Sequence, residues 1–378
     1  MKKLILCLLI ICLVGCSSQT VEEKPQSEVS VVATGDLLFE QGLYDWSRDY
    51  DMDPYFEKVR PLLQSDLTIG NQEVPIGGQE LGVSGVAYTF NAPYQIAEEL
   101  KEAGFNFLTL ANNHTMDMST QGIYNTRKIL KEKKIQNTGM YISKEDRYTI
   151  RVIEKKGIKI AVLAYTYGTN QMPNYAYEVP YFLNEYGQFD EEHQKLLRKD
   201  IEVAKRISDV VLVSMHWGNE FTYELTSVQK EVAAFLNEEG VDVVLGNHSH
   251  CIQPAETLTS STGNQTIVFY SLGNFVSSAA LVDRASPDFQ NMYEVGAVAR
   301  FTIKKDEGIS IENVEIVPVV NHFEHGYTNF QLIPFKDYSE QMAKKHYQKE
   351  FNENFTKSFL SEQIHYVYDS SGFLESEI

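Results

Sequence analysis

Seven short apolar runs recur between residues 31 and 270. They are rich in Val, Ile, Leu and Phe and show little polar alternation, which is typical of strands covered on both faces. We expect strands at 31–34, 67–70, 105–110, 160–165, 210–214, 241–245 and 267–270. Helical patterns lie between them, and we expect helices at 93–103, 120–133, 191–207 and 227–239. This alternation predicts an α/β fold with a mainly parallel sheet.

The pattern changes after about residue 267. Consecutive strand-like segments follow, joined by tight turns such as "KDEG", which is a hairpin signal. They predict either a second sheet packed on the first or an antiparallel extension of it. The last fifty residues are helical and amphipathic, and we expect them to serve packing or a lid. We therefore expect one domain at 30–320 and a helical C-terminal extension at 321–378.

The N-terminus has the pattern of a secretory signal. Two lysines precede an apolar stretch at residues 4–14, which is shorter than the roughly 20 residues of a membrane-spanning helix. It ends in "LVGC", which resembles the bacterial lipoprotein box, in which Cys16 is acylated and becomes the mature N-terminus. The alternative is an ordinary signal peptide or anchor helix with a chance cysteine.

The lipoprotein interpretation predicts the protein's location. Residues 1–15 would be the signal peptide, and the polar segment 16–29 a disordered tether. The protein would be lipid-anchored on the extracytoplasmic face of the cell membrane. Cys251 would remain as a lone thiol, so no intramolecular disulfide is expected.

Composition narrows the class of partner. The 378 residues are 43% hydrophobic and 22% charged, as in a folded soluble protein, and the formal net charge is −19. An acidic surface repels phosphates, so we expect no nucleic-acid binding. Tight binding of any polyanion would need a metal ion or a local basic patch on this acidic protein.

The side chains suited to chemistry follow the predicted strands. In open α/β sheets, ligands bind outside the carboxyl ends of the strands. A single His there is usually a structural hydrogen bonder, and a single Asn or Asp is usually a turn residue or cap. Five strand ends with such residues together predict a site. The residues are Asp36, Asn71, Glu73, Asn112, Asn113, His114, Asp117, His216, Glu220, His248 and His250.

The residue types indicate a metal. Carboxylate, carboxamide and imidazole ligands suit divalent Mn, Zn, Fe or Mg. The sequence has no thiolate cluster, which excludes a structural zinc ribbon. A carboxylate that bridges two ions about 3.5–4 Å apart, surrounded by imidazoles, is the arrangement of two-metal phosphate hydrolysis. We therefore expect one or two divalent ions.

Several motifs occur in order from about residue 29 to 278. They include "TGDLLF", "DLTIGNQE", "ANNHTMD", "HWGNE", "GNHSH" and "SLGNF". Together they resemble the CapA family of capsule and poly-γ-glutamate biosynthesis proteins, whose domain is similar to calcineurin-like metallophosphoesterases. The resemblance implies a two-sheet α/β/β/α sandwich of the metallophosphoesterase type.

The resemblance also implies residue roles. The metal ligands would be Asp36, Glu73 as the bridging carboxylate, Asn113, His216, His248 and His250. His114 would face the substrate as a possible general acid. Around them, Asn71, Asn112, Asp117 and Glu220 would support the site or contact substrate. Asn274 could contribute to the site or be only a turn residue, and Trp217 could stack on a substrate or only wall the pocket.

Two departures from the phosphoesterase pattern affect these roles. Asp36 is followed by Leu37 and Leu38, where phosphoesterases carry Asp-x-His, and the bridging carboxylate is a Glu. One metal position is left with Asp36, Glu73 and His250, and the other keeps Glu73, Asn113, His216 and His248. We expect the second position to bind its ion more tightly, and hydrolytic competence is left open.

Three functions compete. The first is an accessory role in synthesis, export or anchoring of an anionic capsule polymer, poly-γ-glutamate or related, with membrane-bound synthase or export partners. The second is a surface metallohydrolase that acts on phosphoesters or polymer amide bonds. The third is a non-catalytic polymer-binding lipoprotein with a degenerate metal site.

Overall fold

The computed structural model of the chain describes residues 27–279, 285–376 and 378. The expected signal peptide, Cys16 and most of the expected tether lie outside the described residues. Residues 27–29, which we assigned to the tether, instead begin strand β1 (Ser27–Leu37) and pair with β12. Among the described residues, no helix has the length and hydrophobicity needed to span a bilayer.

The first sheet has eight strands and contains both the first and the last strand of the described chain. Its parallel half contains β1, β2 (Leu67–Gln72), β3 (Phe107–Thr109) and β4 (Gln136–Thr138). Its antiparallel half contains β12 (Val295–Lys305), β13 (Ile309–Glu324) and β14 (Thr328–Pro334). The short β11 (Asn274–Val276) pairs with the end of β1.

The second sheet has six strands in the order β5-β6-β7-β8-β10-β9. The four central strands are parallel: β6 (Ile158–Thr166), β7 (Val210–His216), β8 (Val243–Asn247) and β10 (Gln265–Leu272). The antiparallel edge strands are β5 (Arg151–Lys155) and β9 (Ile252–Thr259).

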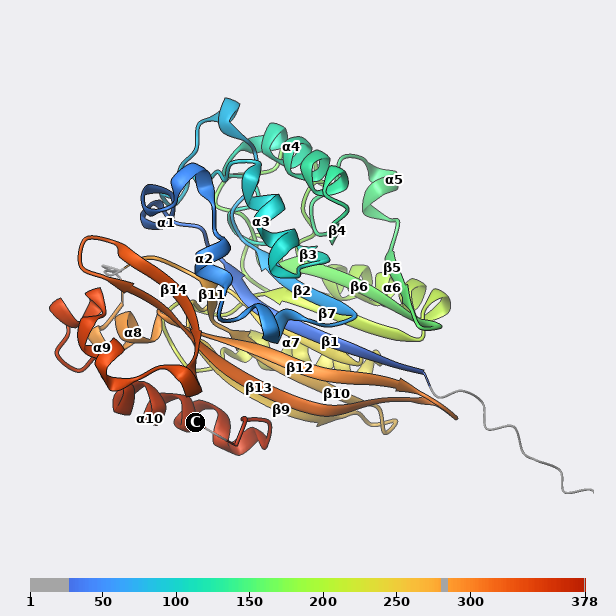
Figure 1. Cartoon of the computed structure of the whole chain (residues 1–378). Coiled ribbons are helices and arrows are strands. Elements are labelled where there is room, and N and C mark those ends of the chain that lie inside the picture. The colour runs from blue at the N-terminus through green and yellow to red at the C-terminus, as the bar shows by residue number, and fades with distance from the viewer. Residues whose placement is uncertain (1–26, 280–284, 377) are drawn as a thin grey trace, which may run out of the picture.

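Helices cover the outer faces of both sheets (Figure 1). The helices α1 (Gln41–Trp46), α2 (Asp53–Phe56), α3 (Gln95–Ala103) and α4 (Ser119–Glu132) belong to the first sheet. The second is covered by α6 (Glu191–Ile207) and α7 (Ser227–Glu238). The order of layers confirms the predicted α/β/β/α sandwich.

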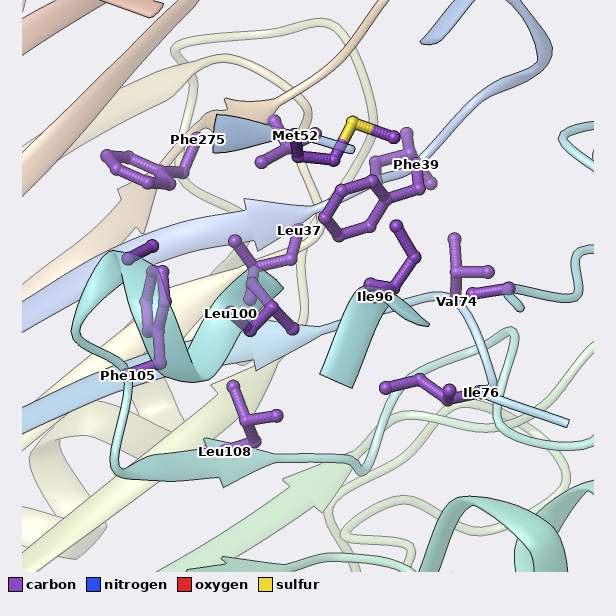
Figure 2. Close-up of a cluster of buried hydrophobic side chains, with 14 of the residues drawn as sticks. Leu37, Phe39, Met52, Val74, Ile76, Ile96, Leu100, Phe105, Leu108 and Phe275 are labelled. Atoms are coloured by element: carbon purple, nitrogen blue, oxygen red, sulfur yellow. The ribbon is translucent and has the colours of Figure 1, made fainter. Parts of the chain in front are cut away.

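The lack of polar alternation in the strands has a simple cause. Alternate residues of one strand belong to two different cores, because both faces of each sheet are covered. In β7, Val210 and Leu212 lie in the core between the sheets, whereas Val211 and Val213 lie in the core under α6 and α7. Figure 2 shows the corresponding outer core of the first sheet, where Leu37, Leu100 and Leu108 gather.

The predicted helical C-terminal region is present, and it begins later than residue 321. The expected boundary at 320 falls inside β13, and the sheet continues through β14. The helices α9 (Glu340–Lys345) and α10 (Lys357–Tyr368) follow. Leu360 and Ile364 of α10 are buried in the core between the sheets, so this helix packs against the sandwich.

Shorter helical segments complete the described chain. Two are the α-helices α5 (Lys144–Arg147) and α8 (Pro287–Met292). The 3-10 turns are η1 (Arg48–Tyr50), η2 (Arg60–Leu63), η3 (Gln79–Leu81), η4 (Phe335–Asp337), η5 (Tyr347–Glu350) and η6 (Asp369–Ser371).

Candidate metal centre

The carboxyl ends of the parallel strands of both sheets meet at one buried place. Asp36 lies at the end of β1 and Glu73 directly follows β2 in the first sheet. His216 ends β7, and His248 follows β8, in the second. The sheets are joined here, because the backbone N–H of His248 donates to Asp36 Oδ2 at 3.1 Å. All four side chains are buried.

Asp36, Glu73 and His250 form a three-residue cluster that could hold a metal ion. One ligand atom of each lies within 4.8 Å of the other two. His250 Nδ1 is 3.8 Å from Asp36 Oδ2, and His250 Nε2 is 3.9 Å from Glu73 Oε1. These separations exceed hydrogen-bonding distance. They place carboxylate and imidazole ligands around one small volume, as a divalent ion requires.

The residues expected at the second metal position adjoin this cluster. His216 Nε2 lies 2.8 Å from Asn113 Oδ1, 3.1 Å from His248 Nδ1 and 3.7 Å from Glu73 Oε1. The six candidate ligands are therefore neighbours, although they span the chain from residue 36 to residue 250. The tighter binding of an ion on this side stays a prediction.

Glu73 is the electrostatically incomplete member of the group. Both of its carboxylate oxygens are buried and have no hydrogen-bond partner among the described residues. Burial, and then the charge of Asp36, raise the pKa of Glu73 well above its ordinary value. A buried carboxylate without a donor or cation is costly. The residues thus fit a cation bound between Glu73 and the imidazoles.

Burial also shifts the pKa values of Asp36 and His216. Burial raises the pKa of Asp36, against the opposing effect of nearby His250. Burial, followed by the charges of His248 and His250, lowers the pKa of His216 well below its ordinary value. Neutral imidazole is the form that binds a metal. His216 therefore offers a ligand lone pair and no positive charge to balance the carboxylates.

Two asparagines orient these ligands. Asn71 Nδ2 donates to Asp36 Oδ1 at 2.7 Å and lies 3.3 Å from His216 Nδ1. Asn274 Oδ1 lies 3.0 Å from His250 Nδ1, so this nitrogen carries the proton when the two groups hydrogen-bond. His250 Nε2 then faces Glu73 as a free ligand atom. Asn274 is thus a buried strand residue beside the site and not only a turn residue.

The loop after β8 has an unusual backbone. His248 has φ 100° and His250 has φ 53°, in the left-handed region that side chains other than glycine rarely adopt. Such conformations cost on the order of 1–3 kcal/mol each. They occur at the two histidines whose spacing suggested a ligand pair, and both imidazoles face the cluster. The strain is therefore located where side-chain direction matters.

His114 is held beside the candidate ligands in one orientation. Its Nδ1 lies 2.8 Å from Asp117 Oδ2, and its backbone N–H donates to Asn112 Oδ1 at 3.0 Å. Phe90 packs edge-on against the ring at 4.7 Å. His114 Nε2 makes no hydrogen bond with any described residue, and the side chain is 7% exposed. That nitrogen can exchange a proton with a bound substrate.

Two sequence-predicted residues lie outside the cluster of ligands. Trp217 packs in the outer core with α7, and its Nε1 donates to Tyr270 O at 2.8 Å. The suggestion that it stacks on a substrate is therefore wrong, because it lies on the other face of β7 from His216. Glu220 is partly exposed, and its charge contributes to the raised pKa of Glu73.

The loop after β6 adds residues that sequence reasoning missed. The Tyr167 ring lies 4.7 Å from the His248 ring. Asn170 Nδ2 lies 3.3 Å from His114 Nδ1, and its backbone N–H donates to Asn113 O at 2.8 Å. The strand-end rule applied to the predicted strand at 160–165 identifies both residues, since they follow its carboxyl end.

Residues 30–279 match the family model described as "Bacterial capsule synthesis protein PGA_cap". The chain belongs to this capsule synthesis family. The matched region contains all six candidate metal ligands, His114 and Asn274. Family membership and the buried cluster therefore concern the same part of the chain.

The chain is similar to proteins of two Bacillus species. The chain is 27% identical over 267 residues to "Capsule biosynthesis protein CapA" of Bacillus anthracis, covering 68% of this chain and 61% of that protein. It is 26% identical over 264 residues to "PGA biosynthesis protein CapA" of Bacillus subtilis (strain 168), covering 68% and 66%. The match with the first of these spans less than two thirds of that relative's length. A hypothetical protein from Thermus thermophilus aligns with TM-score 0.45 and 16% identity over 76% of this chain and 98% of that one.

Proposed function

We propose that this capsule synthesis protein uses a bound divalent metal in the synthesis, export or anchoring of an anionic extracellular polymer. Family membership and the names of the two Bacillus relatives, which refer to capsule and PGA biosynthesis, support the polymer. The observation that carries the metal is Glu73, whose two buried oxygens accept no hydrogen bond from the described residues and lie beside two imidazoles. Poly-γ-glutamate or a related polymer is the proposed substrate or cargo.

The metal would be Mn, Zn, Fe or Mg, as one or two ions. Its ligands would be Asp36, Glu73, Asn113, His216, His248 and His250. When bound, such an ion polarises a phosphoryl or carbonyl oxygen and lowers the pKa of water. Asn71 and Asn274 hold Asp36 and His250 in position through the hydrogen bonds described above.

His114 and Asp117 favour a second candidate, a surface metallohydrolase that acts on phosphoesters or on polymer amide bonds. Asp117 fixes the ring through His114 Nδ1, so Nε2 is the nitrogen that can donate a proton to a leaving group. A non-catalytic polymer-binding protein would use the same fold without this proton transfer.

The metal proposal is tested by Glu73→Gln. We expect this variant to lose metal in elemental analysis and to fail to restore polymer production in cells that lack the protein. Retained metal and full polymer production in the variant would contradict the proposed role.

His114→Asn separates the hydrolase from the accessory role. The hydrolase candidate predicts normal metal content with a fall of about 10²–10⁴-fold in turnover of a phosphodiester or of poly-γ-glutamate. Unchanged turnover would reject His114 as the general acid. If the wild type binds metal but hydrolyses neither compound, the accessory role is favoured.

We also propose that Cys16 is acylated and anchors the protein on the extracytoplasmic face of the cell membrane, beside membrane-bound polymer synthase or export proteins. The "LVGC" segment after an apolar stretch supports this proposal. Cys16→Ala should abolish labelling by a fatty-acid probe and either release the protein from membranes or block its processing. Unchanged labelling and fractionation would refute the anchor.

A further inference from the structure

A basic groove lies along α4, away from the metal ligands. It is a cavity of about 1100 Å³ between α4, β4 and β5. Among the described residues, its lining contains five cationic side chains and no Asp or Glu. These residues are Arg127, Lys128, Lys131, Lys134 and Arg151. Since the chain carries a formal charge of −19, the groove is a local exception to an acidic protein.

The two arginines form a fixed, positively charged side of the groove. Arg127 and Arg151 both pair with the same oxygen of Asp146, Arg127 at 3.2 Å. Arg127 also donates to Asn137 Oδ1, and Arg151 donates to the Asn137 carbonyl at 3.3 Å. Two guanidinium groups thus share one carboxylate. The arrangement holds the arginines in place and leaves excess positive charge beside the groove.

The three lysines are available for a ligand. Lys128, Lys131 and Lys134 are exposed, and none forms an ion pair with another described residue. Glu80 interacts with Lys128 only at longer range. The three-residue spacing keeps Lys128 and Lys131 on one face of α4, and Lys134, two residues after the end of the helix, lines the same cavity. A solvated helix face alone explains exposed lysines, but not their alignment with Arg127 and Arg151 along one cavity.

We propose that this groove binds a linear polymer that carries repeated carboxylates. The inference rests on the proposed polymer function and adds a binding surface separate from the metal centre. The row of cations fits repeated anions better than a single small anion. Tyr124 and Ile142, which are 43% and 39% exposed, supply apolar surface at the same groove for aliphatic parts of the chain.

The groove is connected to the candidate metal centre through α4. This helix begins at Ser119, two residues after Asp117, and its 14 residues span about 21 Å. Gln121 and Tyr124, from the first two turns of α4, and Lys134, two residues after its end, all line the groove. A polymer laid along α4 therefore runs beside the helix that starts at the His114–Asp117 loop.

The test is fluorescence anisotropy of labelled poly-γ-glutamate with the detergent-solubilised full chain. The groove variant is Lys128→Glu, Lys131→Glu and Lys134→Glu together. The control reverses three exposed lysines that form no ion pair with another described residue, Lys58, Lys344 and Lys345; Lys58 and Lys345 lie near His322. We expect at least about a tenfold loss of affinity in the groove variant and less than about a twofold loss in the control.

Three outcomes would overturn the proposal: equal losses in both triple variants, no loss in the groove variant, or tighter binding of polyphosphate than of poly-γ-glutamate by the wild type. The metal proposal is tested separately, because Glu73→Gln should leave polymer binding in the groove unchanged. The groove variant should in turn keep its metal content. Loss of metal with retained polymer binding therefore leaves the groove proposal standing.

Discussion

Two buried carboxylates in this protein differ in how their charge is balanced. Asp200 accepts hydrogen bonds from Arg147 Nη2 at 2.9 Å and from the Tyr165 hydroxyl at 2.8 Å. Glu73 accepts none from the described residues and lies 3.7 Å from the imidazole of His216, whose pKa burial lowers. The first group is complete within the chain and serves the fold. The second has no such partner among the described residues, and it belongs to a cluster that could hold a metal ion.

The largest effect on stability is expected for the buried pair of Arg147 and Asp200. Arg147→Ala should lower the free energy of unfolding by about 3–5 kcal/mol, because it leaves Asp200 buried without its cation. Urea unfolding measures this, and added metal should not restore the loss. Arg198→Ala, which breaks the more exposed pair with Glu239, is the control and should cost about 0–1 kcal/mol. Equal losses in the two variants would contradict the comparison.

Substitution of Glu73 is expected to change the free energy of unfolding in the opposite direction. In metal-free protein, Glu73→Gln should raise the free energy of unfolding by about 1–3 kcal/mol at neutral pH, because it removes an uncompensated buried charge. The folded pKa of Glu73 lies above 4.5, so the cost is absent below that pH and grows as pH rises. The difference between the two unfolding curves should therefore open above about pH 4.5. A variant that is less stable at every pH would show that Glu73 is balanced inside the protein.

A smaller effect is expected for the asparagine that orients His250. Asn274→Ala should weaken metal binding by about 10–100-fold, since the ring loses the partner that fixes its tautomer. Isothermal titration calorimetry gives the affinity, and His250→Ala in parallel shows the effect of losing the ligand itself. A purely structural role for Asn274 predicts lower stability with unchanged metal affinity.

The smallest effect is expected for Trp217, which faces the outer core, whereas His216 faces the candidate metal ligands. Trp217→Phe should cost about 1–2 kcal/mol of stability through lost packing and the lost bond to Tyr270, and it should leave metal affinity unchanged. Thermal unfolding and metal titration on the same sample provide both values. A clear fall in metal affinity would place Trp217 functionally with His216.

The sequence supported the fold and the candidate ligands because both depend on local patterns. Apolar runs identified β1 and β7, and the rule that ligands follow parallel strands identified Asp36 and His216. The same alternation predicts the position of Trp217. Consecutive residues of a strand face opposite sides of the sheet, so Trp217 faces away from His216. Asn274 also follows a predicted strand and was named as a candidate, but its contact with His250 depends on β11, which pairs with β1 from a distant part of the chain.

The basic groove shows why other features were missed. Lys128 and Lys131 alone have the pattern of a solvated helix face, and Arg151 belongs to an edge strand. Only the packing of β4 and β5 beside α4 brings them to one cavity. Tyr167 and Asn170, in contrast, follow a predicted strand, so the rule that ligands follow parallel strands could have identified them.

The most direct test of the central claim is calorimetric titration of the chelated protein with Mn²⁺ and Zn²⁺, for the wild type and for Glu73→Gln. If Glu73 is the carboxylate that needs an external cation, the wild type binds one or two ions and gains thermal stability as they bind. Glu73→Gln then loses both the binding and the gain. Unchanged affinity, stoichiometry and stabilisation in Glu73→Gln would contradict the claim that this buried group is a metal centre.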